Sequence, residues 1–462
     1  MNNILRILLV LVFISSCSLD TKSGLWSKFE NTEEEKRVLI KEQFKEEAVL
    51  ESELNPNLKV NLPGKLINNS FINNLNNNNG QINYNGDLKK TSRFKFSKID
   101  NFNQLEAEIV FVESNVIIFD NKGSILKFDN LSKLIWKRNY YSKSEKKSKP
   151  TLFFGNNNDK LIVADNIAKY YAININTGDL LWSKNNTSPF NSQIKVFKDR
   201  FFVVDFQNIL RCFSLKDGSE LWNYKTDQSF IKSQKKLSLI IVNNKVLFNN
   251  SIGDITAVDA SSGNLIWQTP TQSSTIYEDS FSLKTSDLIA NDSSVLFSNN
   301  RNEFFSLDIK NGAIRWKQKI NSHLRSSLIE NTIISITNEG YLVLTDNRTG
   351  NIIRINHIFK EFRAKGKIFK EFKTKRKFKA RGLGNMNKDK TLKVKGSKNP
   401  VGFIVGSKNI YLTTSHGRLV VIDIKEGKVI SILKIDNEKI SRPFVLNQSL
   451  FIIKDNSIIK LD

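Results

Sequence analysis

The chain has 462 residues, of which 39% are hydrophobic and 25% are charged, a composition typical of folded proteins. Its two cysteines and three histidines exclude a disulfide scaffold and argue against a Cys/His zinc site. The formal net charge of +24 does not by itself indicate a nucleic-acid or membrane partner, because more than half of it lies in one segment described below.

Residues 1–16 have the pattern of an export signal, with a positive charge at Arg6 followed by an apolar stretch that is too short to span a bilayer. Two serines then precede Cys17, and the tetrapeptide that ends there resembles the lipobox of bacterial lipoproteins. The resemblance predicts cleavage before Cys17 and its acylation. The alternative is an ordinary secretory peptide with an incidental cysteine. By the sorting rule of such lipoproteins, Ser18 favours the outer membrane, facing the periplasm.

Residues 17–79 are predicted to be a lipid-anchored linker. Thr32 and Glu35 form a capping-box signature in an acidic segment whose apolar residues recur every four positions, which predicts a short helix. Residues 68–79 are mostly asparagine and cannot bury enough apolar surface to offset the entropy of ordering, so we expect a flexible tether. The helix is either a partner-docking element or a solvated spacer.

Residues 80–462 contain one repeated unit, which predicts the fold. Five copies place tryptophan four residues after a glycine, or after Ser132 in the first copy: Trp136, Trp182, Trp222, Trp267 and Trp316. Their spacings of 46, 40, 45 and 49 residues match one four-stranded blade of a β-propeller. The tryptophans are expected to fill the wedge between neighbouring sheets. Two further copies keep the glycine but carry Arg354 or Ser431 in place of tryptophan.

Residues 441–462 contain short strand runs that lack a fourth strand, which we expect from the N-terminal side, around 80–98. An uncapped linear array would leave both terminal faces apolar. The predicted fold is therefore all-β, an eight-bladed β-propeller of four-stranded antiparallel blades closed by N- and C-terminal strands. Cys212 occupies a slot that is small in other copies, so we interpret it as a core residue and not as a nucleophile.

A basic insertion interrupts the repeat at about 359–398, with sixteen Lys or Arg residues against three acidic ones. The pentapeptide Ile-Phe-Lys-Glu-Phe occurs in it twice, as in a duplicated surface loop. The insertion is either tolerated without a function or binds an anionic membrane through aromatic side chains among its lysines. These are Phe359, Phe362, Phe369, Phe372 and Phe378. We do not expect nucleic-acid binding, because the export signal argues against it.

The segment 257–267, with sequence AVDASSGNLIW, resembles the tryptophan-docking motif of the pyrroloquinoline-quinone-type propellers. Together with the lipobox, the chain length and the blade count, it makes the chain similar to the BamB family of outer-membrane assembly lipoproteins. The resemblance implies no catalysis and no cofactor. It implies a scaffold on the outer membrane that binds the POTRA domains of BamA and assists the delivery of unfolded outer membrane proteins.

In that family, partner binding uses loops on one face, including an apolar-basic element and an aspartate pair. By their order in the repeats, the corresponding loops follow Trp222 and Trp267. They contain Phe230, Ile231, Lys232, Glu278 and Asp279. The aspartate pair itself is not kept, since Ser282 and Lys284 stand in its place.

Two alternatives remain open, a quinone-dependent oxidoreductase built on the same motif and a general envelope adhesion scaffold. A vicinal cysteine pair, which many quinone-binding relatives carry, is missing, and the sequence has no clustered carboxylate loop for calcium. No histidine lies in a nucleophile motif. We therefore predict that the protein is not an enzyme and binds no metal.

Overall fold

The computed structural model describes residues 52–62, 66–67, 81–157, 159–227, 235–271, 283–360 and 399–462. The chain divides into two units, Met1–Ala48 and Val49–Asp462, and all described residues belong to the second. The predicted signal peptide, Cys17 and the acidic helix lie outside the described residues. No helix within the described ranges has the length and apolar character needed to cross a membrane.

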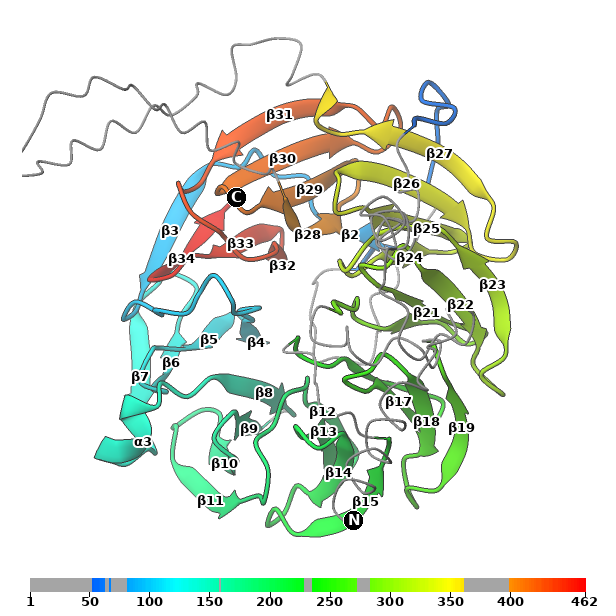
Figure 1. The fold of residues 1–462 in the computed structure, drawn as a ribbon. Coiled ribbons are helices and arrows are strands. Elements are labelled where there is room, and N and C mark those ends of the chain that lie inside the picture. Colours follow the sequence, from blue (N-terminus) through cyan, green and yellow to red (C-terminus); the bar gives the residue numbers. More distant parts are fainter. Residues whose placement is uncertain are drawn as a thin grey trace, which may run out of the picture. The chain divides into compact units, whose positions relative to one another are not determined.

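The described residues form eight four-stranded antiparallel sheets arranged as blades around a ring (Figure 1). This confirms the predicted eight-bladed propeller. The inner-to-outer strands of blades 1 and 2 are β4 (Val110–Val112), β5 (Asn115–Phe119), β6 (Ile125–Phe128), β7 (Leu134–Arg138), and β8 (Leu152–Asn156), β9 (Lys160–Asp165), β10 (Lys169–Asn174), β11 (Leu180–Asn185). Those of blades 3 and 4 are β12 (Lys195–Phe197), β13 (Arg200–Val204), β14 (Ile209–Ser214), β15 (Glu220–Lys225), and β16 (Leu239–Val242), β17 (Lys245–Asn249), β18 (Ile255–Asp259), β19 (Leu265–Thr269).

Blades 5 to 7 continue the same order. Their strands are β20 (Ile289–Ala290), β21 (Ser294–Ser298), β22 (Phe304–Asp308), β23 (Ile314–Gln318), then β24 (Ser327–Ile329), β25 (Thr332–Ile336), β26 (Tyr341–Asp346), β27 (Ile352–His357), then β28 (Pro400–Val405), β29 (Asn409–Thr414), β30 (Arg418–Asp423), β31 (Val429–Lys434). Among the described residues, three small elements lie outside the blades: β1 (Leu66–Ile67), β2 (Gln81–Ile82) and the one-turn helix α3 (Lys143–Lys147).

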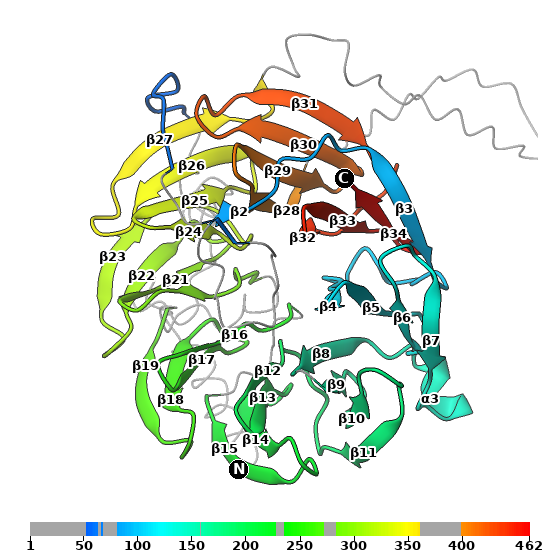
Figure 2. The ribbon, with the colours of Figure 1, turned by 180° about the vertical axis from the view of Figure 1, so that it is seen from behind.

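Blade 8 combines the two ends of the described chain. Its inner strands are β32 (Phe444–Leu446), β33 (Ser449–Ile453) and β34 (Ser457–Leu461), and its outer strand is β3 (Lys90–Lys95). Figure 2, which views the ring from behind, shows β3 beside β34. Phe94 is fully buried there, with its ring edge-on to Phe128 of blade 1. The expected closing strand from 80–98 is thereby confirmed.

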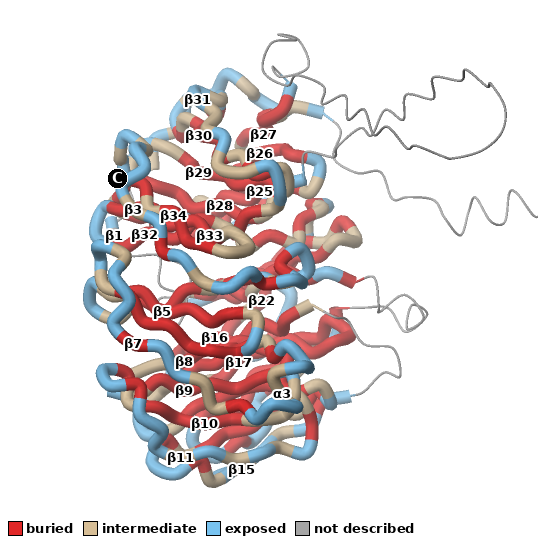
Figure 3. The backbone as a smooth tube through the Cα atoms, turned by 90° about the vertical axis from the view of Figure 1, so that its left-hand side faces the viewer, coloured by how far each residue is buried: buried red, intermediate tan, exposed pale blue. Residues whose placement is uncertain are grey.

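Burial follows strand position within each blade. Backbone coloured by burial shows largely buried strands inside the ring and exposed segments outside it (Figure 3). The outer strands alternate in burial, as in the pattern of β11, and they expose apolar side chains beside the tryptophan. Buried apolar residues form clusters that bridge every pair of neighbouring blades. The ring is thus stabilised by the packing of sheet on sheet, since no blade can cover both of its faces alone.

The turn between the third and outer strands explains the repeat. Asp259 accepts hydrogen bonds from the backbone N–H groups of Ser261 and Ser262, and Gly263 then adopts a left-handed φ of +76°. A bulge shifts the register after Ala257, which pairs with Trp267. The small residue six positions before the glycine therefore lies directly opposite the tryptophan on the adjacent strand. The same pairing occurs at Ala172, Cys212 and Ser306.

Part of the predicted linker packs against the ring. Residues 52–62 run along the edge of β27, where Leu54 and Ile355 exchange backbone hydrogen bonds at 3.3 and 2.9 Å. We call residues 52–62 the strap. Further along, Tyr84 is fully buried against Tyr411, with ring centroids 4.9 Å apart.

One assignment to the basic insertion is wrong. The membrane-binding alternative places Phe359 in the membrane interface, but Phe359 is buried, and its ring covers Gly340 inside blade 6. Gly340 has a φ of +90° and no Cβ, which leaves room for the ring. The rest of the insertion, 361–398, lies outside the described residues.

Candidate functional site

Each of the five repeat tryptophans lies on the outer strand of one blade and covers the turn glycine of the next. A Cβ added to Gly263 would lie 2.6 Å from the indole of Trp222, and one on Gly312 would lie 2.5 Å from that of Trp267. Such contacts leave no space for any side chain. The pairs are Trp136 on Gly178, Trp182 on Gly218, Trp222 on Gly263, Trp267 on Gly312 and Trp316 on Gly350.

The same turn also offers a carbonyl oxygen to the preceding blade. Trp267 Nε1 and Lys245 Nζ both donate to the carbonyl oxygen of Ile309, each at 3.2 Å. Trp182 and Lys160 bind the carbonyl oxygen of Leu215 in the same way. An indole and a cation from one blade thus satisfy a backbone acceptor of the next, which fixes the register between blades.

In blade 6, Arg354 stands in the tryptophan slot and makes the equivalent contact. It is completely buried, and its guanidinium donates to the carbonyl oxygens of Ile424 and Lys425 at 2.8 and 2.7 Å. A third hydrogen bond, of 2.8 Å, goes to the carbonyl oxygen of Leu58 in the strap. Asn356 adds a hydrogen bond to the carbonyl oxygen of Pro56. Arg354 therefore joins two blades and the strap.

The connections between blades share one face of the ring. Strands alternate in direction within a blade, so every outer strand ends on the face where the next inner strand begins. The described ends of the connections β15 to β16, β19 to β20 and β27 to β28 lie on this face, which we call the connection face. The predicted partner residues Phe230, Ile231, Lys232, Glu278 and Asp279, and also Ser282, belong to these connections and lie outside the described residues. Lys284 is described and exposed, with its backbone N–H bound to Asn300 at 2.7 Å.

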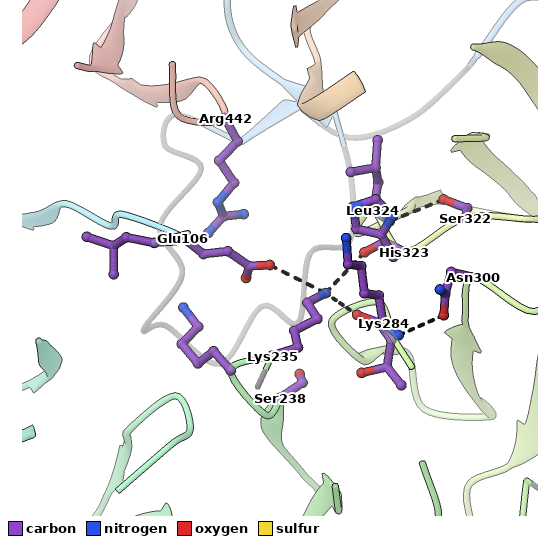
Figure 4. A network of polar contacts seen from close by, with 12 residues as sticks. Glu106, Lys235, Ser238, Lys284, Asn300, Ser322, His323, Leu324 and Arg442 are labelled. Carbon is purple, nitrogen blue, oxygen red and sulfur yellow. Dashed lines mark hydrogen bonds and ion pairs between the residues drawn. The ribbon is translucent and has the colours of Figure 1, made fainter. Parts of the chain in front are cut away.

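On this face, charged side chains converge at the centre of the ring, and we call them the central cluster. Lys235 lies 3.6 Å from Glu106 in an ion pair and donates to the backbone oxygens of Thr285 and His323. Figure 4 shows Glu106, Lys235 and His323 together with Arg442, which approaches from blade 8. The members of the cluster are Glu106, Glu108, Lys195, Lys235, Lys236, Asp287, His323, Arg325, Lys439 and Arg442.

Glu108 joins two blades within the central cluster. Its Oε1 lies 2.5 Å from Lys236 Nζ and 3.7 Å from Arg442 Nη2. Lys236 is buried, with 7% of its side chain exposed, so this ion pair is well shielded from water. Lys439 contributes from a further connection by donating to the carbonyl oxygens of Asn103 and Leu105 at 2.9 and 3.2 Å.

The electrostatics of the central cluster are dominated by cations. Burial, reinforced by repulsion from Arg325, lowers the pKa of Lys195 to about 7. Burial and the neighbouring Arg442 lower the pKa of Arg325 to about 9. Burial and Lys235 lower the pKa of His323 to about 4. Burial alone would raise the pKa of Asp287, but Lys235, Lys236, Arg442 and Arg325 together lower it to about 2.

The arrangement of the other titratable groups offers no assembled centre within the described ranges. No group of three or more His, Cys, Asp or Glu residues is placed there to hold a metal ion. Cys212 is buried in β14, and burial raises the pKa of its thiol to about 12. It is therefore protonated and inert at neutral pH.

Sequence analysis missed the central cluster, although a signal exists. Three members stand two residues before the first residue of a short inner strand: Glu108, Arg325 and Arg442. A charge at that recurrent position is informative only after the blades are aligned, because a single charged residue before a strand is ordinary.

Comparison with known proteins supports one family. The profile of the outer membrane protein assembly factor BamB matches residues 121–356, more than half of the chain. A search of curated proteins found no match. Among solved structures, BamB from Moraxella catarrhalis is similar at 16% identity, with a TM-score of 0.58, covering 81% of this chain and 99% of that one.

Other solved propellers are similar in fold alone. A quinohemoprotein alcohol dehydrogenase from Comamonas testosteroni has 9% identity and a TM-score of 0.60, covering 83% of this chain and 78% of its own. The computationally designed Ika8 protein has 11% identity and a TM-score of 0.56, covering 80% of this chain and 99% of its own. Identities this low carry the fold and not the chemistry. The profile match, in contrast, covers most of the repeats, and the chain therefore belongs to the family of the outer membrane protein assembly factor BamB.

Proposed function

We propose that this protein is a non-enzymatic scaffold lipoprotein of outer-membrane β-barrel assembly that binds the POTRA domains of a BamA-type protein. The observation that carries the proposal is the BamB profile match over residues 121–356 of a closed propeller. A ring whose blades are joined by indole and cation contacts is rigid. When a partner binds to the loops of a rigid scaffold, few groups have to be ordered, so the entropic cost of binding is small.

The connection face is the proposed partner surface. The connections after Trp222 and Trp267 both start there, and they contain Phe230, Ile231 and Lys232 in the first and Glu278 and Asp279 in the second. An apolar pair beside a lysine, and a carboxylate pair nearby, suit a mixed apolar and charged protein interface. Unfolded outer membrane proteins are proposed as further ligands of the same scaffold.

The test is an affinity purification from detergent-solubilised envelopes with the tagged full-length chain. We expect it to recover a BamA homologue. Ile231→Asp and the double change Glu278→Lys with Asp279→Lys should each reduce recovery at least tenfold, since they reverse the polarity of the surface. Lys408→Glu, a charge reversal in the exposed β28–β29 turn on the opposite face, is the matched control and should leave recovery unchanged. Recovery of no BamA homologue by the unmodified chain would refute the proposal.

Anchoring in the outer membrane, facing the periplasm, is proposed through acylation of Cys17. Cys17→Ser should move the protein from the detergent phase to the aqueous phase in a two-phase partition, because a thioether-linked lipid is lost. Mass spectrometry of the mature N-terminus measures the acyl chains directly. An unmodified Cys17 in the wild-type protein would contradict the anchor.

A quinone-dependent oxidoreductase is the second candidate, and the likeness in fold to the alcohol dehydrogenase from Comamonas testosteroni is the observation in its favour. Titration of the purified chain with pyrroloquinoline quinone separates the two. Stoichiometric uptake with a changed quinone absorbance would favour the oxidoreductase. A general envelope adhesion scaffold differs only in its partner, so the same affinity purification tests it.

A further inference from the structure

The central cluster holds more positive than negative charge. Among the described residues, six cations, namely Lys195, Lys235, Lys236, Arg325, Lys439 and Arg442, act on three carboxylates, Glu106, Glu108 and Asp287. Charges of one sign brought together away from bulk water destabilise the folded state unless an opposite charge joins them. The cluster therefore favours an additional anion.

Two guanidinium groups of the cluster are short of acceptors. Arg442 Nη2 is buried and has no hydrogen-bond partner, and its nearest carboxylate oxygen, 3.7 Å away on Glu108, is engaged by Lys236 at 2.5 Å. No hydrogen bond or ion pair joins Arg325 to another described residue, although it is half-buried and lies within the electrostatic reach of Arg442, Asp287 and Glu108. A buried donor without an acceptor, such as Arg442 Nη2, is uncommon in native proteins and calls for a ligand or water.

The residues come from separate blades, and each stands at the start of an inner strand, on the connection face. Lys195 belongs to the inner strand of blade 3, Arg325 precedes that of blade 6, and Arg442 precedes that of blade 8. Mutual repulsion is part of the reason why the pKa values of Lys195 and Arg325 are lowered. A ligand bound between these three residues would have cationic side chains on several sides.

We propose that the central cluster binds a small oxyanion with at least two negative charges, of the phosphate or polycarboxylate class, through Arg325, Arg442 and Lys195. The planar guanidinium fork matches two oxygens of either class, and the lysine adds a point charge. The carboxylates of Glu108 and Asp287 attract the cationic side chains and orient them, so that these side chains do not all move toward the anion. This site is independent of the proposed partner-binding role.

The experiment is equilibrium dialysis of the full-length chain in non-ionic detergent against radiolabelled inorganic phosphate or citrate, with sodium chloride holding the ionic strength constant. We expect saturable binding of about one anion per chain, since three cations can enclose one such ligand. Binding of phosphate alone identifies the phosphate class, and binding of citrate alone identifies the carboxylate class. If neither anion binds at concentrations up to roughly 10 mM, the binding free energy is weaker than about 3 kcal/mol, and the proposal is overturned.

Variants distinguish a specific binding site from nonspecific electrostatic attraction of anions. Arg325→Gln and Arg442→Gln should each weaken binding about tenfold or more, and Arg325→Lys should weaken it less because it keeps the charge but loses the fork. Arg348→Gln changes a guanidinium that is 69% exposed in the β26–β27 turn on the opposite face and serves as the matched control. If a glutamine variant fails to fold, Arg325→Lys still tests the site. Equal affinity in Arg325→Lys, Arg348→Gln and the wild type would mean that Arg325 does not hold the anion.

Discussion

At the scale of single residues, the turn between the third and outer strands carries glycine where the preceding blade covers it with a large side chain. Ser132 occupies this turn in blade 1 with a φ of +68°, a conformation that L-residues rarely adopt. The preceding outer strand there is β3, whose sequence KTSRFK contains no tryptophan. The side chain that covers the turn, and not backbone conformation alone, therefore makes glycine necessary.

Gly263→Ala is expected to destabilise the protein by roughly 2 kcal/mol or more, since it combines a left-handed φ with a Cβ that would lie 2.6 Å from Trp222. Ser132→Gly, in contrast, should change stability by less than about 1 kcal/mol, because relief of strain and the added freedom of the unfolded chain nearly cancel. Urea unfolding followed by tryptophan fluorescence measures both. Equal losses in the two variants would show that the indole is irrelevant.

Trp267→Ala should cost about 3–5 kcal/mol, because the indole is buried and the change opens a cavity over Gly312. It also removes one of the two donors to the carbonyl oxygen of Ile309. Leu131→Ala, at a side chain that is 76% exposed, is the control and should change stability by less than about 0.5 kcal/mol. The midpoint of thermal unfolding is a sufficient measurement, and a shift as small as that of the control would contradict the docking role.

At the scale of elements, the outer strands are edges, and the strap is the one described segment that pairs with such an edge. The sequence shows that Arg354 replaces the repeat tryptophan in its blade, but it does not show which groups Arg354 binds. Arg354 binds the carbonyl oxygens of Leu58, Ile424 and Lys425, and backbone acceptors leave no signature in sequence. Residues 52–62 also lack the alternating pattern of a strand, so the strap was predicted only as linker.

Arg354→Gln is expected to release the strap while the ring stays closed. The shorter amide cannot reach all three carbonyl oxygens, which leaves buried acceptors unsatisfied. Hydrogen exchange of the amides of Leu54, Leu58 and Val60, which donate to Ile355, Asn55 and Lys425, should accelerate at least tenfold. Amides of β14, far from this contact, provide the internal control. Unchanged protection of the strap would show that its backbone hydrogen bonds suffice without Arg354.

At the scale of the whole molecule, a repeat of one motif was enough to predict the blade, the blade count and the closing strand. Periodic tryptophans and glycines report contacts between consecutive blades, which are local in sequence. The central cluster escaped prediction because its members are joined only by ring closure: Glu108 and Lys236 form an ion pair at a separation of 128 residues. Contacts between consecutive blades recur at regular intervals along the sequence, whereas the residues that ring closure brings together at the centre do not.

The central cluster should make stability depend on pH through Lys195. Its pKa is about 7 in the folded protein because of burial and of Arg325 and Arg442, with Glu108 and Asp287 opposing. Between pH 7 and the ordinary lysine pKa, the unfolded chain binds a proton that the folded chain does not, so this group makes stability rise with pH across that window. Lys195→Met should therefore stabilise the protein more at pH 7 than at pH 9.5, as urea midpoints in chloride buffer would measure.

The matched control for that measurement is Lys408→Met, at an exposed lysine on the opposite face. It should give the same small change at both pH values. A Lys195→Met variant whose advantage over the wild type is equal at pH 7 and pH 9.5 would exclude Lys195 as the origin of the slope. A larger advantage at pH 9.5 would reverse the sign and exclude it as well.

The pairing of β3 with β34 sets the order in which the chain reaches its final state. Arg93 and Ser457, which are hydrogen-bonded across this pair, are 364 residues apart. During synthesis β3 is the first blade strand to emerge, and its edge stays unpaired until β34 has been made. Loss of β34 would thus leave β3 without its mate, so a frameshift just before Ser457 would leave the ring open although seven blades are complete.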